Sequence, residues 1–170
     1  MIHFLSMAVM LLTGCGEQAP APTADPDPNP KPPAEEATAA TAASAEPAAP
    51  RSGEQVYKEV CQTCHQASGE GLAGVYPPLA GSEWPVKDAK TPIRIVLHGL
   101  QGEIEVLGQK YNNVMAPWGP ALSDIEVANV LNHVRTSWGN KADEITPEQV
   151  AEVRKADDGH APWTVAELSQ

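Results

Sequence analysis

Apolar side chains are distributed very unevenly along the chain. Residues 2–12 are mostly apolar, whereas residues 17–50 contain no Val, Ile, Leu, Met, Phe, Trp or Tyr. From residue 51 onward large apolar residues return, and in two segments they have the spacing that lines one face of a helix. The pattern therefore places a core that includes these helices in the second part of the chain.

Two segments predict the principal helices of that core. In the first, Ser52 is a candidate N-cap, and the apolar residues that follow fall on one face. In the second, residues 122–140, Ser123 and Glu126 have the spacing of a capping box. The apolar positions are Val56, Tyr57 and Val60 in the first helix and Val127, Val130, Leu131, Val134 and Trp138 in the second.

The stretch without large apolar side chains, residues 17–50, consists mostly of Ala and Pro. Because it has no apolar surface of any size to bury, the entropy lost on ordering it would not be offset. We expect a disordered linker with polyproline II character, which extends by about 3 Å per residue.

The apolar run at residues 2–12 is too short to span a bilayer as a helix and is typical of an export signal. It ends in LTGC, residues 12–15, which resembles the lipobox of bacterial lipoproteins. That resemblance implies that residues 1–14 are a cleaved signal peptide and that Cys15 is acylated. Residues 15–50 would then tether the protein to the periplasmic or extracytoplasmic face of a membrane. The alternative is an ordinary secretory signal with an incidental cysteine.

The net charge of −11 is spread unevenly. Residues 51–140 hold seven Lys or Arg against nine Asp or Glu, so most of the excess acid lies in the linker and beyond residue 141. A chain without a basic patch cannot neutralise many phosphates, which excludes nucleic-acid binding as a function class.

The segment CQTCH, residues 61–65, places a histidine directly after the second of two cysteines. Cys-x-x-Cys-His is the attachment sequence for c-type haem. At a helix end Cys61 and Cys64 lie on one side of the chain, so both sulfurs can reach vinyl groups of a flat macrocycle while His65 turns its imidazole under the iron. The motif therefore predicts one covalently bound haem c with His65 as an axial ligand.

Three other uses of these residues compete with haem. A structural zinc site needs four ligands, and no second Cys or His pair follows at a matching spacing. A thioredoxin-like dithiol needs a βαβ context, which the pattern lacks, and gains nothing from His65. A disulfide between Cys61 and Cys64 is the third alternative, although its ring would be tight.

Met115 is the candidate for the second axial ligand. Electron-transfer haems often pair His with Met, and the other methionines, Met1, Met7 and Met10, fall in the expected signal. Met115 lies in NNVMAPWGP, whose Asn, Pro and Gly residues predict a loop able to cross a haem face. The alternative is a methionine that fills a gap in the core.

His98 and His133 are rival ligands. His133 borders the buried stripe of the second helix, where a packed or half-exposed histidine is the simpler interpretation. His98 ends the apolar run of residues 93–97 before a glycine, where it either stands near the haem edge or caps the segment.

Five motifs lie along residues 53–140: CQTCH (61–65), YPPLAGSEW (76–84), IVLHGLQG (95–102), YNNVMAPWG (111–119) and LSDIEVANVLNHVRTSWGN (122–140). Together they resemble the class I cytochrome c domains of bacterial respiratory chains. The first and fourth are specific to haem binding, and the others are consistent with it. The resemblance implies a small all-α fold over residues 51–140, with N- and C-terminal helices that cross near the haem and loops that enclose it.

The resemblance also implies contacts to the haem from the loops. The carbonyl of Pro77 or Pro78 would accept a hydrogen bond from the His65 ring nitrogen that does not bind iron. Candidates for packing on the macrocycle or bonding its propionates, with plain core filling as the alternative, are Trp84, Tyr111 and Trp118.

Residues 141–170 extend past the usual end of such a domain. The Thr-Pro step at residues 146–147 predicts a helix start. The segment APWTVAEL resembles a terminal extension of some members, held over the domain surface through Trp163, and a loosely attached tail is the alternative. The short apolar face of the extra helix would consist of Val150, Ala151 and Val153.

These features imply a membrane-tethered mono-haem electron-transfer protein of a bacterial respiratory chain that cycles between Fe(II) and Fe(III). Ligation by Met115 argues against the open iron site that a haem enzyme or gas sensor needs. We expect a monomer that meets its redox partners through small, short-lived interfaces. The alternative is a permanently docked cytochrome subunit of a dehydrogenase, nitrite reductase or terminal oxidase complex.

Overall fold

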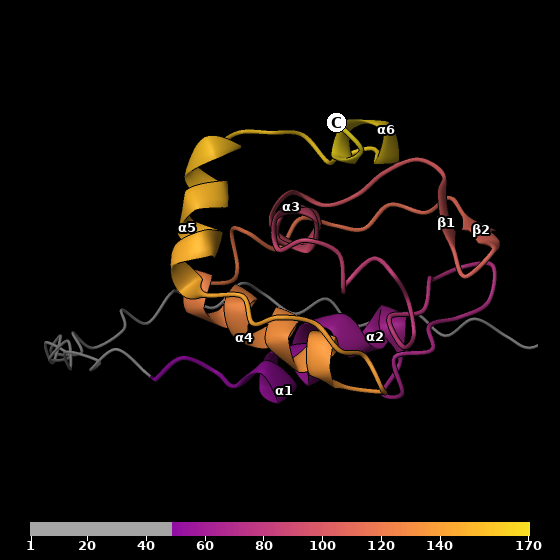
Figure 1. The fold of residues 1–170 in the computed structure, drawn as a ribbon, viewed down its shortest axis with the longest axis horizontal. Helices are drawn as coiled ribbons and strands as arrows, with labels where there is room; N and C mark the ends of the chain where they lie inside the picture. The colour runs from indigo at the N-terminus through magenta and orange to yellow at the C-terminus, as the bar shows by residue number, and fades with distance from the viewer. Residues whose placement is uncertain (1–48) are drawn as a thin grey trace, which may run out of the picture. The chain divides into compact units, whose positions relative to one another are not determined.

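The structure is a computed structural model that describes residues 49–170 (Figure 1). The expected signal peptide, the lipobox with Cys15 and nearly all of the linker lie outside the described residues. Among the helices that are described, none combines the length and the apolar character needed to cross a bilayer.

The first helical segment ends at the Cys-x-x-Cys-His motif, as predicted. Ser52 caps it by accepting a hydrogen bond from the backbone N–H of Gln55. Within the segment the N–H of Gln62 donates to the carbonyl of Tyr57, one residue further back than in an α-helix. A locally widened turn therefore leads into the motif. The parts of the segment are α1 (Gly53–Val56), the π-helical turn η1 (Tyr57–Cys61) and α2 (Gln62–His65).

Helix α4 (Asp124–Thr136) is the predicted second helix. Its capping box of Ser123 and Glu126 is present, and the predicted apolar stripe is buried as far as Val134. The assignment of Trp138 to this helix was wrong. The helix ends two residues earlier, and Trp138 lies in the following turn with a φ of 53°.

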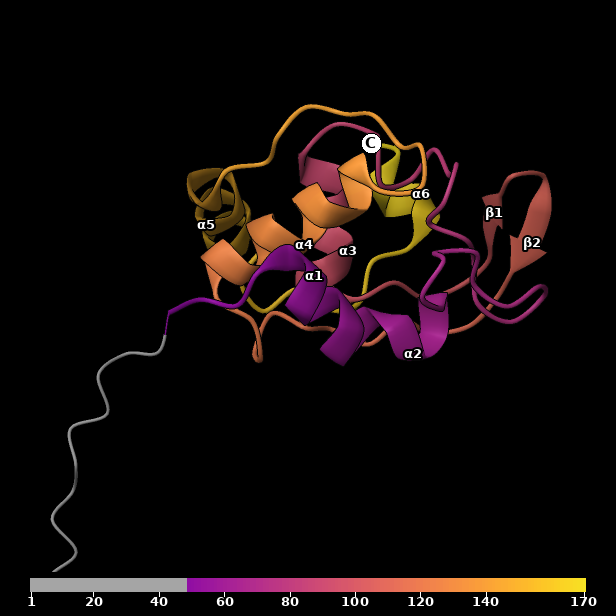
Figure 2. The ribbon, with the colours of Figure 1, turned by 90° about the horizontal axis from the view of Figure 1, so that it is seen from below.

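The N-terminal helix and α4 cross at close range. Figure 2 shows α1 lying across α4. A Cβ on Gly53 would overlap the backbone carbonyl of Asn129, so only a glycine allows the two backbones to approach this closely. Beside this point the rings of Tyr57 and His133 pack with centroids 5.5 Å apart. The crossing that the resemblance implies is therefore present.

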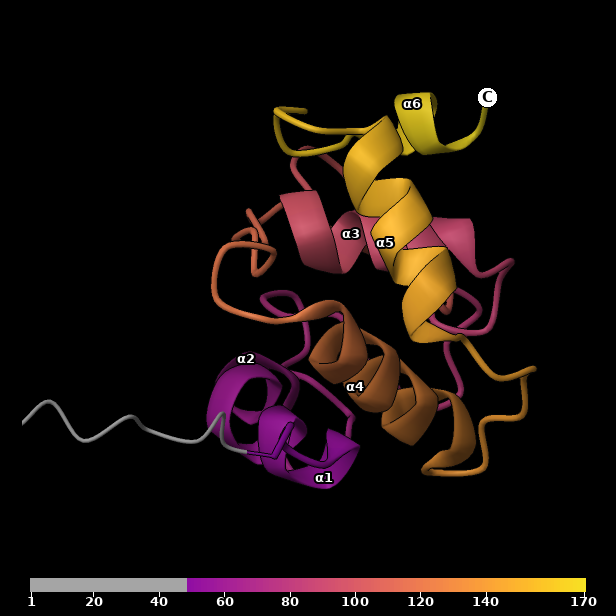
Figure 3. The ribbon, with the colours of Figure 1, turned by 90° about the vertical axis from the view of Figure 1, so that its left-hand side faces the viewer.

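Helices α3 (Lys90–His98) and α5 (Pro147–Ala156) complete the core. Helix α5 packs against both α3 and α4 (Figure 3). Val150 and Val153 are buried, with 0 % and 8 % of their surfaces exposed, as predicted. Ala151 is exposed, so its place in the apolar face was wrong, because the residue after Val150 is turned about 100° away around the helix.

The all-α prediction missed a small sheet. Strands β1 (Ile104–Val106) and β2 (Gln109–Tyr111) pair antiparallel. Leu107 and Gly108 join them, and both have positive φ, 50° and 76°, as a tight two-residue hairpin turn requires. A last short helix, α6 (Val165–Leu168), follows α5. The described fold is therefore helical with one two-stranded sheet.

Buried apolar side chains form two clusters. The larger joins α1, α3, α4 and α5. The smaller lies around the hairpin, and Met115 is partly buried against it. The smaller cluster consists of Leu100, Ile104, Val106, Tyr111 and Trp163.

Candidate functional site

His65 ends α2 and is buried, with 9 % of its surface exposed. Its Nδ1 lies 3.0 Å from the carbonyl oxygen of Pro77, and because a carbonyl can only accept, Nδ1 is the donor. Nε2 then keeps its lone pair, which has no hydrogen-bond donor among the described residues. Burial lowers the pKa of His65, against the opposing effect of the Pro77 bond, so the ring is neutral and able to bind a metal. Of the two candidate prolines, Pro77 supplies the carbonyl, and Pro78 lines the adjacent cavity.

Cys61 and Cys64 lie beside His65. Cys61 lines the same cavity as Pro78, and both cysteines line a second cavity that adjoins it. Their sulfurs are not joined to each other in the structure. Burial, and to a lesser extent the charge of Cys64, raises the pKa of the Cys61 thiol to about 11. A dithiol oxidoreductase needs a thiol pKa shifted in the opposite direction, so this geometry disfavours that alternative.

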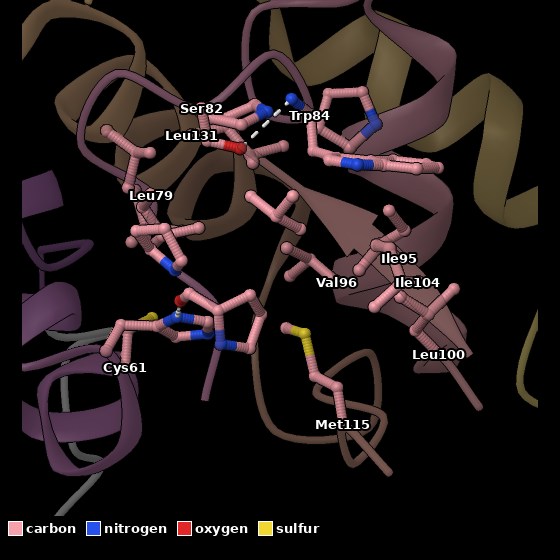
Figure 4. Close-up of a pocket in the computed structure, with 18 residues that line it drawn as sticks. Cys61, Leu79, Ser82, Trp84, Ile95, Val96, Leu100, Ile104, Met115 and Leu131 are labelled. Atoms are coloured by element: carbon pink, nitrogen blue, oxygen red, sulfur yellow. Dashed lines mark hydrogen bonds between the residues drawn. The ribbon is translucent and has the colours of Figure 1, made fainter. Parts of the chain in front are cut away.

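An apolar cavity extends from the end of α2 to the loop that carries Met115 (Figure 4). His65 and Cys61 line one part of it and Met115 another, while α3, α4 and β1 supply further walls. A second, adjoining cavity shares these three residues and also contacts Cys64. The wall side chains that Figure 4 labels include Leu79, Ile95, Val96, Leu100, Ile104 and Leu131.

Met115 reaches the cavity from the loop at residues 112–118, and Figure 4 shows its sulfur directed into the cavity. Its backbone N–H donates to the carbonyl of Leu100 at 2.9 Å, and its carbonyl accepts from the Leu100 N–H at 3.1 Å. Further along, the N–H of Trp118 donates to the carbonyl of Val96 at 2.9 Å. The loop is therefore fastened to the end of α3 and to the residues that follow it.

The three aromatic candidates all lie at the cavities. Trp84 lines the first, but its indole N–H donates to the carbonyl of Glu105 at 3.0 Å and is not available to a propionate. Tyr111 and Trp118 line the second. The Tyr111 hydroxyl donates to the side-chain oxygen of Gln109 at 3.2 Å. The Tyr111 ring belongs to the smaller apolar cluster.

The rival ligands His98 and His133 line neither cavity. His133 packs on Tyr57 and Trp138, with ring centroids 5.5 Å and 5.9 Å away. His98 lies at the end of α3, and its Nε2 is buried without a hydrogen-bond partner in the part of the chain that is described. Neither histidine is placed to take the position of Met115.

The donor set distinguishes between the candidate metal sites. Within residues 49–170 no three His, Cys, Asp or Glu side chains gather around a common point where a metal ion could bind. A structural zinc site is therefore not supported. The cavity instead offers apolar walls, the Nε2 of His65, the thioether of Met115 and two thiols at its edge, which is the donor set that fits haem c.

The sequence analysis did not identify the part of the cavity wall that the hairpin supplies. Ile104 and Val106 reach it from the unexpected hairpin. The alternation of apolar and polar residues in IEVLGQKY, with a glycine in the turn, is the signal that could have revealed this hairpin. No local pattern shows that Leu100 pairs with Met115, because that contact joins residues far apart in the chain.

Comparison with known proteins agrees with this geometry. Residues 48–134 match the family model described as cytochrome c oxidase, cbb3-type, subunit III. Cytochrome c-552 of Thermus thermophilus is 39 % identical over 125 residues, which cover 61 % of this chain and 94 % of the relative.

Two further relatives are cytochrome c subunits that are longer than the segment they share with this chain. The cytochrome c subunit of alcohol dehydrogenase (quinone) from Gluconacetobacter polyoxogenes is 36 % identical over 114 residues, covering 65 % of this chain and 23 % of the relative. The gluconate 2-dehydrogenase cytochrome c subunit of Pantoea cypripedii is 35 % identical over 133 residues, covering 71 % and 29 %. The chain therefore belongs to the cytochrome c family, as an electron-transfer domain of the type that the cbb3 subunit III model describes, and the family implies haem c as its cofactor.

Proposed function

We propose that the protein is a membrane-tethered mono-haem carrier that passes single electrons between redox proteins on the extracytoplasmic side of a bacterial membrane. The observation that carries the proposal is the apolar cavity that His65 and Met115 both line. When bound, haem c supplies a one-electron Fe(II)/Fe(III) couple.

His65 and Met115 would be the two axial ligands of the iron. The Pro77 carbonyl fixes the His65 ring in the tautomer that leaves Nε2 able to coordinate. Two ligands from the protein leave no open position for a substrate or a gas, which favours electron transfer over a haem enzyme or sensor. Cys61 and Cys64, at the cavity edge, would hold the macrocycle through thioether bonds.

Apolar side chains at one end of the cavity suit brief contact with a partner. Val114 lines the second cavity and is 69 % exposed, and Val75, which precedes the lining residue Tyr76, is 36 % exposed. The side-chain amide of Asn113 donates to the Val75 carbonyl at 2.9 Å, which joins these two segments beside Cys64. A small apolar face at the cavity mouth is what weak, transient redox docking requires.

A fixed subunit of a dehydrogenase complex is the second candidate. It is favoured by the relatives that are cytochrome c subunits of alcohol and gluconate dehydrogenases. Purification from membranes in mild detergent separates the two functions. A mobile carrier elutes alone, whereas a fixed subunit elutes in a constant ratio with its dehydrogenase.

The test of the ligand set is a comparison of the full chain with Met115→Ala. The wild-type ferric protein is expected to show the weak absorption band at the red end that marks sulfur ligation, and Met115→Ala is expected to lose it. The reduction potential of the variant should fall, because loss of the thioether favours the ferric state. Haem should remain with the chain after denaturation and solvent extraction, as thioether bonds require.

Val114→Ala is the matched control. It removes a neighbouring apolar side chain from the same loop, and that side chain is 69 % exposed. The band and the potential should stay at their wild-type values. If Met115→Ala also kept both, Met115 would not be the ligand, and if the haem could be extracted, covalent attachment would be wrong.

A further inference from the structure

The segment that holds Met115 is itself held by the C-terminal extension. Leu100 exchanges two backbone hydrogen bonds with Met115, at 2.9 Å and 3.1 Å. On its other side, the N–H of Gln101 donates to the carbonyl of Trp163 at 2.8 Å, and the N–H of Trp163 donates to the carbonyl of Gly99 at 3.0 Å. Leu100 is thus the middle of a three-stranded bridge, antiparallel to Met115 and parallel to Trp163.

The Trp163 side chain anchors this bridge. It is 6 % exposed and belongs to the apolar cluster that also contains Leu100 and against which Met115 packs. The His160 imidazole stacks on the indole, with centroids 3.6 Å apart and planes within 8°. The Arg94 guanidinium also lies over the indole, 4.2 Å from a ring centre, so both His160 and Arg94 contact Trp163.

Arg94 is in turn fixed to the extension. Its Nε and Nη2 donate to the two carboxylate oxygens of Asp157 at 2.8 Å and 3.1 Å. Both side chains are largely buried, with 18 % and 11 % of their surfaces exposed. A buried, bidentate ion pair of this kind holds its two side chains in a more defined geometry than a surface ion pair does. Because Arg94 lies on α3 and Asp157 follows α5, the pair joins these helices directly beside Trp163.

The Met115 loop has few attachments of its own. Asn112, Val114, Ala116 and Pro117 are exposed, and the backbone bonds of its second half begin only at Trp118. Between those points the two backbone hydrogen bonds with Leu100 hold Met115 in its position at the cavity. A shift of Leu100 would therefore move Met115 with it.

We propose that Trp163 is a positioning residue for Met115. Through its contacts with His160 and Arg94, Trp163 keeps Leu100 in place and through Leu100 holds the Met115 sulfur at the cavity. The inference rests on the proposed ligation by Met115. An internal ligand competes with any external one, so the fraction of molecules with Met115 displaced sets the apparent affinity of the iron for an added ligand.

The test uses the full-length holoprotein and imidazole as the added ligand of ferric iron. Trp163→Ala removes both contacts to the indole and is expected to tighten imidazole binding by about tenfold. It should weaken the red absorption band only by the fraction of molecules in which Met115 is displaced. Trp163→Phe keeps a stackable ring and is expected to bind imidazole with nearly wild-type affinity. Arg94→Gln breaks the cation contact with Trp163 and the ion pair with Asp157, and it should tighten imidazole binding by about threefold. This variant provides the test if Trp163→Ala does not accumulate as folded protein.

Val150→Ala is the stability control. Val150 is 0 % exposed in the larger apolar cluster, away from Leu100 and Trp163. Its truncation should lower the free energy of unfolding but leave imidazole affinity unchanged. If Trp163→Ala lowered stability in the same way and left both imidazole affinity and the red band at wild-type values, the role of Trp163 would be purely structural and the inference overturned.

The same data distinguish a failure of the ligand assignment. If Met115 were not the ligand, the wild-type protein would lack the red band and Met115→Ala would not alter imidazole binding. If Met115→Ala abolished the band while Trp163→Ala and Arg94→Gln matched wild type, the ligand assignment would stand and the positioning role would fail.

Discussion

Gly99 shows how a single residue without a side chain shapes the site. It ends α3 with φ and ψ of 84° and 175°, a conformation that is essentially restricted to glycine. A Cβ at this position would lie 2.5 Å from the carbonyl oxygen of Met115 and 3.1 Å from the nitrogen of Pro117. Both backbone strain and direct overlap therefore require glycine where the Met115 loop passes the helix end.

Gly99→Ala is expected to destabilise the protein by about 3 kcal/mol, from the strained conformation together with the overlap. It should also displace Met115, because the overlap is with that residue's own carbonyl. Denaturant unfolding measures the first effect and the red absorption band the second. Gly102→Ala is the matched control, since Gly102 has nearly the same φ, 83°, but nothing within 4 Å of the added Cβ. It should cost about 1 kcal/mol and leave the band intact, and equal losses in the two variants would contradict the explanation.

At the scale of elements, Glu126 links the two crossing helices. One carboxylate oxygen accepts from the Nε of Arg51 at 2.6 Å, and the other accepts from the backbone N–H of Ser123 at 3.0 Å. The Arg51 carbonyl accepts from the side-chain amide of Asn129 at 2.9 Å. The Glu126 carboxylate thus joins the N-terminus of α4 to Arg51, two residues before the start of α1. The Arg51 bond is the largest cause that lowers the pKa of Glu126 from its ordinary value of 4.5 to about 2.

Glu126→Gln is expected to lower the free energy of unfolding at pH 7 by about 1 kcal/mol. Because the folded-state pKa is depressed, the stabilisation is present in full above pH 4.5 and is lost as the pH falls towards 2. The difference between the two proteins should therefore shrink below pH 4.5 and vanish below pH 2, where Glu126 is protonated in both the folded and the unfolded state. Unfolding titrations at several pH values measure it.

Glu59→Gln is the control for this pair. Glu59 bonds the same Arg51 at 2.7 Å, but its side chain is 55 % exposed and it takes no part in the cap. Solvent screens such a pair, so its loss should cost at most a few tenths of a kcal/mol. A pH-independent loss in Glu126→Gln would show that the carboxylate acts through packing and not through its charge.

At the scale of the whole molecule, the charge and the apolar residues are divided between different parts of the chain. Residues 51–140 are nearly balanced in charge and supply most of the buried core, whereas the first 50 residues hold six acidic side chains against one basic one. We propose that this acidic, Ala- and Pro-rich stretch carries the domain at the membrane. A tether of that kind raises the local concentration of the domain near membrane-bound partners without fixing its orientation.

Cys15→Ser tests the anchor. Without an acylated cysteine, the haem-containing protein is expected to move from the membrane fraction to the soluble fraction, because the proposed attachment is through the acyl chains on Cys15. The haem absorbance of both fractions provides the measurement and shows that export and haem attachment still occur. Full retention of the variant in washed membranes would rule out lipid anchoring through Cys15.

Features that a few consecutive residues encode could be predicted from the amino-acid sequence. The Cys-x-x-Cys-His motif, the N-cap at Ser52, the capping box at Ser123 and the start of α5 each depend on side chains within one helical turn of each other. Such local contacts follow from spacing and residue type alone. The roles of His65 and Met115 as ligands are predictions of this kind, and the shared cavity supports them.

How distant segments meet became visible in the folded chain. The tertiary structure selected Pro77 as the acceptor for His65, placed Trp138 beyond α4, formed the hairpin and set Leu100 between Met115 and Trp163. These outcomes depend on backbone hydrogen bonds and packing between residues up to about sixty positions apart, and no propensity or periodicity in a short window reports such contacts. The chain thus encodes the chemistry of the site locally, while the geometry that holds Met115 arises from the folded whole.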